Sequence, residues 1–389
     1  MSAATTTNWS YPTAVRFGAG RISELGEACK ACNMENPLLV TDPGIASLPI
    51  TATAVAAAKS AGIDCSVFSD IKANPTGSNI EDGIEAYRSG KHDSVIAFGG
   101  GSGLDAAKVI AFMQAQNRPI WDFEDVGDWW TRADPAGIAP IIAVPTTAGT
   151  GSEVGRAGVI TNEETHTKKV IFHPDMMPKI VICDAELTVG LPPAMTAGTG
   201  FDAFVHCLEA YCAPSYHPMS EGIAVEGMRL VKEYLPVAFK NGDDIEARGH
   251  MLTAAAMGAT AFQKGLGGIH ALSHPVGAMH DTHHGITNAM FTPYVLLTNR
   301  AAIEQKLVRL SDWLGIGNGF QGLFNYLLEL RETLEIPHTL MQLGVDSPDI
   351  DKIAAMSLED PTAGGNPIPM THAMCVGIME KAIAGDCAL

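Results

Sequence analysis

Five histidines lie in one short stretch in the second half of the chain. The segment GGIHALSHPVGAMHDTHHG, residues 267–285, holds five of the 13 histidines in the sequence: His270, His274, His280, His283 and His284. His270 and His274 are four positions apart, so on a helix they share one face, one turn from each other. A lone buried histidine is usually a satisfied core residue, whereas this density favours a group of metal ligands.

A second pair of candidate ligands precedes the cluster. In GFDAFVHCLEA, Asp202 and His206 have the same spacing. One carboxylate with several imidazoles suits Fe(II), Zn(II), Co(II) or Mn(II), and it lacks the thiolates of a structural zinc site. The sequence therefore predicts a divalent metal, but spacing alone leaves open which of the histidines bind it.

A glycine-rich loop in the first half indicates a phosphate-binding site. SVIAFGGGSGLDAAKVIAFM (94–113) has the pattern of a strand, a loop and a helix, and Gly101, Gly103 and Ala106 match G-x-G-x-x-A. Glycines let backbone N–H groups approach an anion, which the helix dipole also favours. The usual ribose-binding acid follows such a loop, but here the better candidate is Asp42, upstream in LLVTD. A second loop, PTTAGTGSE (145–153), could contact the diphosphate or the nicotinamide, or could be a plain turn.

The hydrophobic pattern predicts a scaffold with two parts. In the first half, buried runs alternate with helical stretches, and we expect strands at 37–42, 64–70, 93–100 and 138–147 and helices at 50–62, 79–90 and 103–116. Such alternation predicts a parallel sheet covered on both faces. Beyond about residue 190 the patterns are long and helical. We therefore predict an α/β, Rossmann-like nucleotide-binding domain, residues 1–190, and an all-α metal-binding domain, residues 191–389.

Composition narrows the class of partner. The net charge of the 389-residue chain is −18, from 43 acidic and 25 basic residues, and such a surface repels nucleic acid and anionic lipid. No apolar run is long enough to span a bilayer, and the N-terminal residues lack the apolar core of a secretory signal. The eight scattered cysteines, including the C-x-x-C of Cys29 and Cys32, are typical of reduced thiols. We expect a cytoplasmic protein.

Four motifs together resemble the iron-dependent (group III) alcohol dehydrogenases over nearly the whole chain. They are GGGSGLDAAK, PTTAGTGSE, GFDAFVHCLEAY and IHALSHPVGAMHDTHHG. The resemblance implies Asp202, His206, His270 and His284 as metal ligands and His274 as a non-ligand beside the nicotinamide and the substrate. It also implies a cofactor-binding set, with Lys169 as the alternative to its last member: Asp42, Asn74, Gly100, Gly101, Ser102, Asp105, Lys108, Thr146, Thr147 and Lys168.

Three positions depart from the commoner pattern of that family, and they concern the substrate. His280 stands where many members have an aromatic residue, His283 where many have Pro, and Ile368 where many have Arg. The candidate substrate residues are Lys264, His280, His283 and Thr362. Lys264 could hold a substrate carboxylate as a charge-assisted hydrogen bond, or it could cap the negative end of the preceding helix and point to solvent.

The expected function is an NAD-linked, metal-dependent alcohol dehydrogenase or aldehyde reductase. It would act on a small primary alcohol or aldehyde, with an anionic or polar far end as one option, using Fe(II), or Zn(II) as the second choice. His274, or a water that it holds, would relay the hydroxyl proton to solvent. The resemblance implies a homodimer or a larger homo-oligomer.

Two alternatives from other classes remain open. A sugar-phosphate cyclase resembling dehydroquinate synthase would need a basic pocket for a substrate phosphate, and few Lys or Arg residues lie near the histidines in the sequence. A non-enzymatic metal-storage or sensor protein would leave the glycine loop unexplained.

Overall fold

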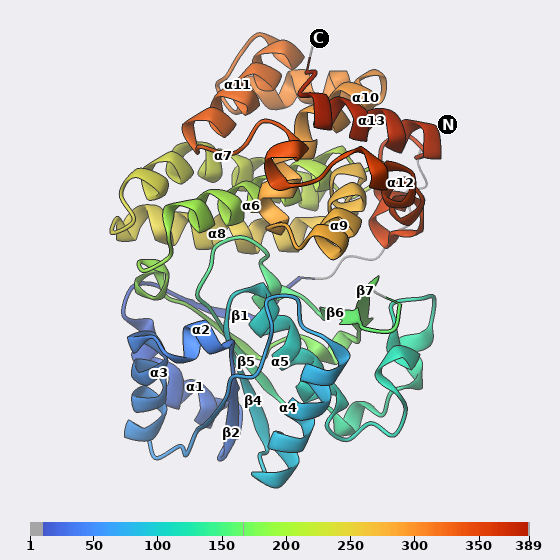
Figure 1. The fold of residues 1–389 in the computed structure, drawn as a ribbon. Coiled ribbons are helices and arrows are strands. Elements are labelled where there is room, and N and C mark those ends of the chain that lie inside the picture. Colours follow the sequence, from blue (N-terminus) through green and yellow to red (C-terminus); the bar gives the residue numbers. More distant parts are fainter. Residues whose placement is uncertain (1–10, 166, 388–389) are drawn as a thin grey trace. The chain divides into compact units, whose positions relative to one another are not determined.

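The computed structural model describes residues 11–165 and 167–387, and it divides them into two compact units (Figure 1). The α/β unit comprises Tyr11–Thr147 and Gly151–Gly190. The helical unit comprises the chain from Leu191 onward together with Ala148–Thr150, a short piece of the PTTAGTGSE loop.

The α/β unit is built on a six-stranded parallel sheet, which confirms the predicted fold class. The strand order is β1-β8-β5-β4-β2-β3. Four strands lie where the sequence predicts them: β2 (Pro37–Val40), β3 (Ser66–Phe68), β4 (Ser94–Gly99) and β5 (Ile141–Pro145). Two more, β1 (Ala14–Phe17) and β8 (Ile180–Cys183), were not predicted. Every residue of β2, β4 and β5 is buried, as expected for central parallel strands.

Helices cover both faces of this sheet. On one face, α1 (Leu25–Ala31) and α3 (Pro49–Ser60) share a hydrophobic core with alternate strand residues such as Phe98 and Val144. The intervening residues of the same strands point to the other face of the sheet. There α5 (Gly101–Met113) packs against β4 and against α4 (Gly77–Ser89). A short helix, α2 (Pro43–Ala46), follows β2 directly.

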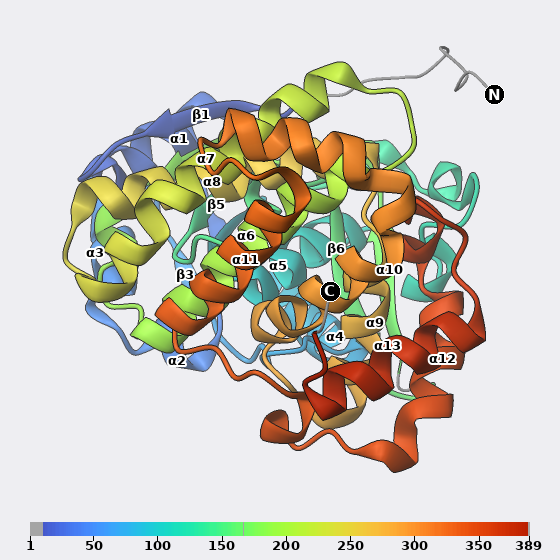
Figure 2. The same ribbon diagram turned by 90° about the horizontal axis from the view of Figure 1, so that it is seen from above.

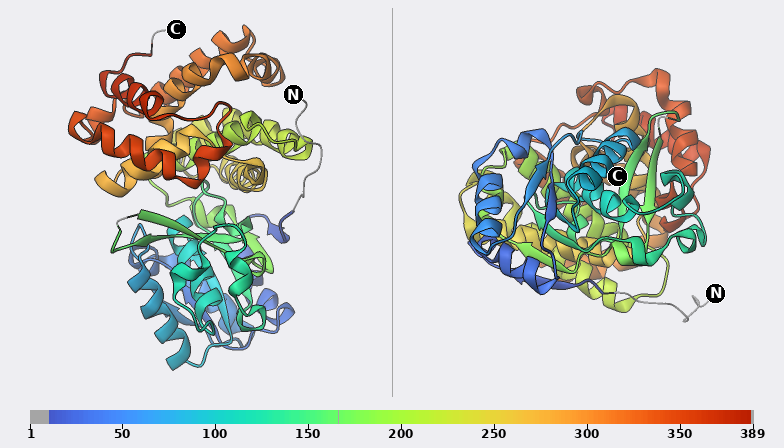
Figure 3. Two further views of the ribbon diagram at one scale, coloured as in Figure 1. Left: turned by 90° about the vertical axis from the view of Figure 1, so that its right-hand side faces the viewer. Right: turned by 90° about the horizontal axis from the view of Figure 1, so that it is seen from below.

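A separate hairpin, absent from the predicted elements, extends the α/β unit. Strands β6 (Ala157–Asn162) and β7 (Thr167–Phe172) form a two-stranded antiparallel ribbon outside the main sheet (Figure 3). The ribbon is anchored on α5, because the Asp105 carboxylate accepts a hydrogen bond from the N–H of Val159 at 2.9 Å.

The helical unit contains eight α-helices among its described residues, and no strand follows Cys183 there. Its central helix, α6 (Pro193–Cys212), is buried along nearly all of its length and packs against three others: α7 (Pro218–Lys240), α8 (Ile245–Ala261) and α10 (His284–Trp313). The remaining helices are α9 (Gly268–His280), α11 (Gly319–Thr333), α12 (Ile350–Glu359) and α13 (His372–Ala384).

Within this unit α12 packs against both α9 and α13 (Figure 2). In the part of the chain that the structure describes, no helix combines the length and the apolar character needed to cross a membrane.

Candidate active site

The four predicted metal ligands come together around one carboxylate oxygen in the helical unit. Asp202 and His206 share a face of α6, His270 lies in the first turn of α9, and His284 is the first residue of α10. The Nε2 atoms of His206 and His270 are each 3.8 Å from Asp202 Oδ1, and that of His284 is 3.6 Å away.

This donor set fits a divalent metal. A tetrahedral metal with bonds of about 2.1 Å holds its ligand atoms about 3.4 Å apart, close to the separations observed. Asp202, His206 and His270 are buried, and their ligand atoms lie within 4.8 Å of one another. The side chain of His284 is 29% exposed and joins the group from its edge. One carboxylate and three imidazoles suit Fe(II) or Zn(II).

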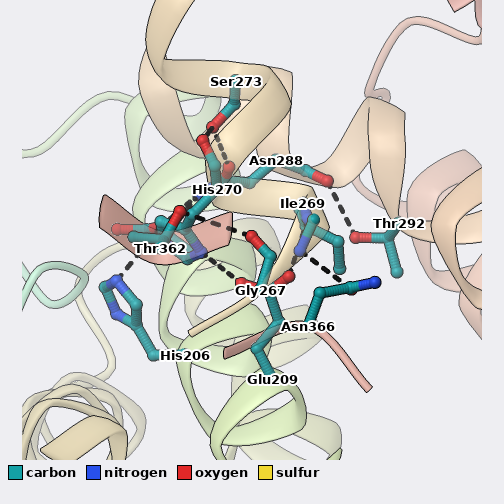
Figure 4. A network of polar contacts seen from close by, with 12 residues as sticks. His206, Glu209, Gly267, Ile269, His270, Ser273, Asn288, Thr292, Thr362 and Asn366 are labelled. Carbon is teal, nitrogen blue, oxygen red and sulfur yellow. Dashed lines mark hydrogen bonds and ion pairs between the residues drawn. The ribbon is translucent and has the colours of Figure 1, made fainter. Parts of the chain in front are cut away.

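Glu209, which the sequence analysis missed, fixes His270. It lies on α6 two turns after Asp202, and its Oε2 atom is 2.6 Å from His270 Nδ1. Its Oε1 atom accepts the N–H of Ile269 at 2.7 Å and so caps α9, whose N-cap residue is Gly267 (Figure 4). With Nδ1 of His270 donating to Glu209, Nε2 keeps its lone pair for a metal. The helical spacing from Asp202 was the available signal.

Burial and charge control the protonation of the two inner histidines. Burial lowers the pKa of His206 to about 4, although Asp202 opposes this, so the ring is neutral as a metal ligand must be. For His270, burial also disfavours the proton, but the hydrogen bond and the charge of Glu209 outweigh it and raise the pKa.

His274 lies beside the ligands and is held by a second carboxylate. Its ring stacks on that of His284 with 5.2 Å between centroids, and its Nδ1 atom is 2.8 Å from Asp360 Oδ2. The other oxygen of Asp360 accepts hydrogen bonds from the N–H and the hydroxyl of Thr362. Burial raises the pKa of Asp360, but His274 and Thr362 together outweigh it and hold the pKa below the ordinary value. Asp360 is 86 residues from His274 in the chain, so no local pattern indicated the pair.

Lys264 is engaged within the protein. Its side chain is fully buried, and its Nζ atom donates to Ala213 O at 2.7 Å, Tyr211 O at 3.1 Å and Glu221 Oε1 at 2.8 Å. An ammonium group has three donors, so none is left for a substrate carboxylate. Lys264 does cap a helix, but that helix is α6 rather than the preceding α8, and the side chain does not reach solvent. The structure therefore does not support the expected contact between Lys264 and a substrate carboxylate.

The other candidate substrate residues have local partners. His280 lies near Asp349, with 3.3 Å between Nε2 and Oδ2. His283 is the N-cap of α10, and its Nδ1 atom accepts the N–H of Ile286 at 3.4 Å. The Thr362 hydroxyl donates to Asp360 at 2.5 Å. These contacts order the segments around the metal ligands, and a role at the substrate stays a prediction for all three.

The glycine loop of the α/β unit has the form of a phosphate site. It joins β4 to α5, and Gly99 has a φ of +137°, which side chains rarely tolerate. Gly100 is the N-cap of α5 without a side-chain cap, and the first N–H that bonds back to it is that of Leu104. The three N–H groups before Leu104 lie at the positive end of the helix dipole, where a diphosphate binds favourably.

Neighbouring strand ends complete this candidate nucleotide site. β2 and β5 flank β4, so Asp42 and Thr146 follow strands that end at the same edge of the sheet as Gly100. Among the described residues, the buried hydroxyls of Thr41 and Thr146 have no hydrogen-bond partner, as expected at a ligand site. Asp42 also caps α2 by accepting the N–H of Ile45 at 3.0 Å through Oδ1, so one of its oxygens has a structural role.

The remaining predicted cofactor residues fall into three sets with different surroundings. The Ser102 hydroxyl donates to the carbonyl of Ala73, next to Asn74, and Thr147 lies against Gly100. Asp105 and Lys108 instead hold the structure together: buried Lys108 donates to the carbonyls of Ser152 and Ala157 and pairs with Asp105 at 3.3 Å. On β7, Lys169 pairs with Glu124 at 2.9 Å, and strand alternation places Lys168 on the opposite face.

In one mechanism of alcohol oxidation, a Lewis acid activates the hydroxyl and a nucleotide accepts the hydride. The chain has a candidate site for each, a combination typical of metal-dependent dehydrogenases. Comparison with known proteins identifies the family: the model for iron-containing alcohol dehydrogenases matches residues 12–185, and that for the C-terminal part of the same family matches residues 196–383. The chain belongs to the iron-containing alcohol dehydrogenase family.

Individual relatives match over almost their whole length. The chain is 35% identical to 4-hydroxybutyrate dehydrogenase of Cupriavidus necator, over 96% of this chain and 99% of the relative. The structure of a 1,3-propanediol oxidoreductase superposes with a TM-score of 0.93 at 31% identity, covering 97% of this chain and all of that one. The structure of sulfoacetaldehyde reductase from Bifidobacterium kashiwanohense in complex with NAD⁺ superposes with a TM-score of 0.90 at 27% identity. The match covers 98% of this chain and all of that one.

These findings confirm the expected enzyme class, an NAD-linked alcohol dehydrogenase of the iron-containing type, and give no support to the cyclase or to the metal-storage alternative. The choice of individual ligand and cofactor residues stays a prediction.

Proposed function

We propose that the protein oxidises a short primary alcohol, or reduces the matching aldehyde, with one divalent metal and NAD. The observation that carries this proposal is the convergence of three imidazole nitrogens on Asp202 Oδ1. The other unit of the chain supports it with a glycine loop that we expect to bind phosphate. A bound metal lowers the pKa of an alcohol hydroxyl, and the nicotinamide accepts the hydride.

The protein's own groups position the reactants and move the proton. Asp202, His206, His270 and His284 would hold the metal, and Glu209 keeps His270 turned toward it. With Nδ1 of His274 donating to Asp360, Nε2 is left to take up the hydroxyl proton. The His274 side chain is 20% exposed, so the proton can continue to solvent.

Asp42 supports a preference for NAD over NADP. One of its oxygens caps α2, and the other remains at the strand edge where a ribose is expected, so its charge repels a 2′-phosphate. Asp42→Gly should narrow the gap in kcat/KM between the two cofactors. Asp42→Asn is the matched control, because it keeps a cap and removes only the charge. An unchanged NAD/NADP ratio in both variants would exclude this role.

For the substrate, we propose a short ω-hydroxy acid or its aldehyde. The support comes from the names of two relatives, 4-hydroxybutyrate dehydrogenase and sulfoacetaldehyde reductase. The substrate in each name has an anionic group at one end. The test compares 4-hydroxybutyrate with 1-butanol and 1,4-butanediol on iron-reconstituted protein with NAD, followed by NADH absorbance. We expect kcat/KM to be at least about tenfold higher for the acid, the effect of one specific contact worth about 1.4 kcal/mol. Equal or lower values for the acid would refute this substrate class but not the dehydrogenase.

The setting of the enzyme is also a proposal. All eight cysteines are free thiols, which supports a reducing compartment and so the cytoplasm. A homodimer or larger homo-oligomer is expected from the family resemblance, and light scattering of the purified protein would measure it.

A further inference from the structure

One buried side chain points at the metal ligands without being one of them. Asn288 lies on α10, one turn after His284, and is fully buried. Its Nδ2 atom donates to Asp202 Oδ1 at 2.7 Å and lies 3.3 Å from His270 Nε2 and 3.1 Å from His284 Nε2. The Asn288 amide therefore contacts three of the four atoms that the proposed metal would need.

The direction of this amide is set from its other end. The hydroxyl of Ser273 on α9, itself fully buried, donates to Asn288 Oδ1 at 2.5 Å (Figure 4). The oxygen and the nitrogen of an amide side chain can be exchanged by rotating the group. Here the Ser273 hydroxyl donates to the oxygen and the Asp202 carboxylate accepts from the nitrogen, so both neighbours favour the same orientation. The N–H donors of Asn288 consequently face Asp202 and the imidazoles.

The Nε2 atom of a neutral imidazole has a single lone pair, so it cannot accept an N–H of Asn288 and bind a metal at the same time. Asp202 is a buried carboxylate, and a buried charge needs hydrogen-bond donors or a cation. We propose that the Asn288 amide competes with the metal for the Nε2 lone pairs of His270 and His284. It stabilises the ligand cluster when no metal is bound, and it weakens metal affinity so that the metal can exchange. This inference rests on the proposed metal site.

The test measures Co(II) affinity by chelator competition and thermal unfolding with and without Co(II), in wild type and in Asn288→Ala. Removing the competitor should tighten Co(II) binding by up to roughly tenfold, as for the loss of one hydrogen bond. The metal-free protein should lose more stability than the loaded one, so the stabilisation by Co(II) grows. Ser273→Ala, which frees the amide to rotate, should shift affinity in the same direction by less.

Thr292→Val is the matched control. Thr292 is buried one turn further along α10 and donates to the backbone carbonyl of Asn288, not to a ligand, so affinity should not change. Weaker or unchanged Co(II) binding in Asn288→Ala would overturn the inference while leaving the metal site intact, since the amide would then orient the ligands or only fill space. If wild type itself bound no Co(II), the proposed metal site would fail, and this inference with it.

Discussion

At the scale of single residues, the proposed chemistry depends on Asp202. It is one of the most enclosed charges in the helical unit, and its Oδ1 atom has three imidazole nitrogens and one amide nitrogen around it. Groups behind these atoms, Glu209 behind His270 and Asp360 behind His274, select the ring nitrogen that faces the site. The site is therefore a network of carboxylate–histidine pairs, in which each carboxylate sets the tautomer of a neighbouring imidazole.

His284 and His274 are adjacent rings with different predicted roles, which single substitutions can separate. His284→Ala should lower metal content, because it removes a ligand. His274→Ala should keep the metal and lower kcat by about 10²–10⁴-fold, the usual worth of a proton-transfer group. Metal analysis of both purified variants, together with kcat, distinguishes them. Full metal in His284→Ala with loss of metal in His274→Ala would reverse the assignment.

Lys264 is predicted to act on stability and not on substrate charge. Lys264→Met should leave the Ala213 carbonyl without its buried hydrogen-bond donor. Lys306 would still donate hydrogen bonds to Glu221 and to the Tyr211 carbonyl. Loss of that donor should cost roughly 2 kcal/mol of unfolding free energy. Thermal unfolding measures the cost, and the ratio of kcat/KM for 4-hydroxybutyrate and 1-butanol should not change. A selective loss of activity on the acid would restore Lys264 to the substrate site.

At the scale of elements, the loop after β5 contains a buried acid that the sequence analysis did not single out. Glu153 lies in the short turn Ser152–Val154, is 1% exposed, and its Oε1 atom has no hydrogen-bond partner among the described residues. Burial raises the pKa of Glu153 to about 7, although Lys108 opposes the shift. The folded protein therefore binds a proton at Glu153 over a range of pH in which the unfolded chain has released it.

The raised pKa of Glu153 predicts how the free energy of unfolding changes with pH. An unfolded glutamate titrates near pH 4.3, so the contribution of Glu153 to stability should fall as pH rises from about 4.3 to 7 and then level off. Glu153→Gln keeps the shape and lacks the charge. Relative to wild type, it should gain up to about 3 kcal/mol between pH 4.5 and pH 8. Thermal unfolding of both proteins across this range is the measurement, and parallel pH profiles would contradict the assignment.

Sequence patterns predicted some elements and not others, for physical reasons. The central strands β2, β4 and β5 are buried on both faces and appear as continuous apolar runs. The edge strand β1 has only four residues, three of them exposed, so it is too short for a buried strand pattern. Strand β7 is mostly half-buried and contains two lysines, so it has no continuous apolar run. In the site, helical spacing revealed Asp202 with His206, but Asp360 comes from a distant turn and could be found only in three dimensions.

At the scale of the whole molecule, each unit contains one part of the proposed chemistry. The α/β unit has the glycine loop and the strand-edge residues predicted to bind NAD, and the helical unit has the predicted metal ligands. Metal and nucleotide binding can therefore be measured separately. The enzyme class could be predicted from sequence because four motifs occur together along the chain. The substrate could not, because the residues that depart from the family pattern, such as His280 and His283, have partners that only the structure reveals.

The central claim is that one divalent metal in the helical unit activates the alcohol. The direct measurement is an anaerobic titration of Fe(II) into chelator-treated protein with saturating NAD and alcohol, in which NADH formation is followed at each addition. The account predicts almost no activity before iron, a linear rise, and saturation at one equivalent per chain. Full activity after complete metal removal, or activity that never responds to Fe(II), Zn(II) or Co(II), would contradict it.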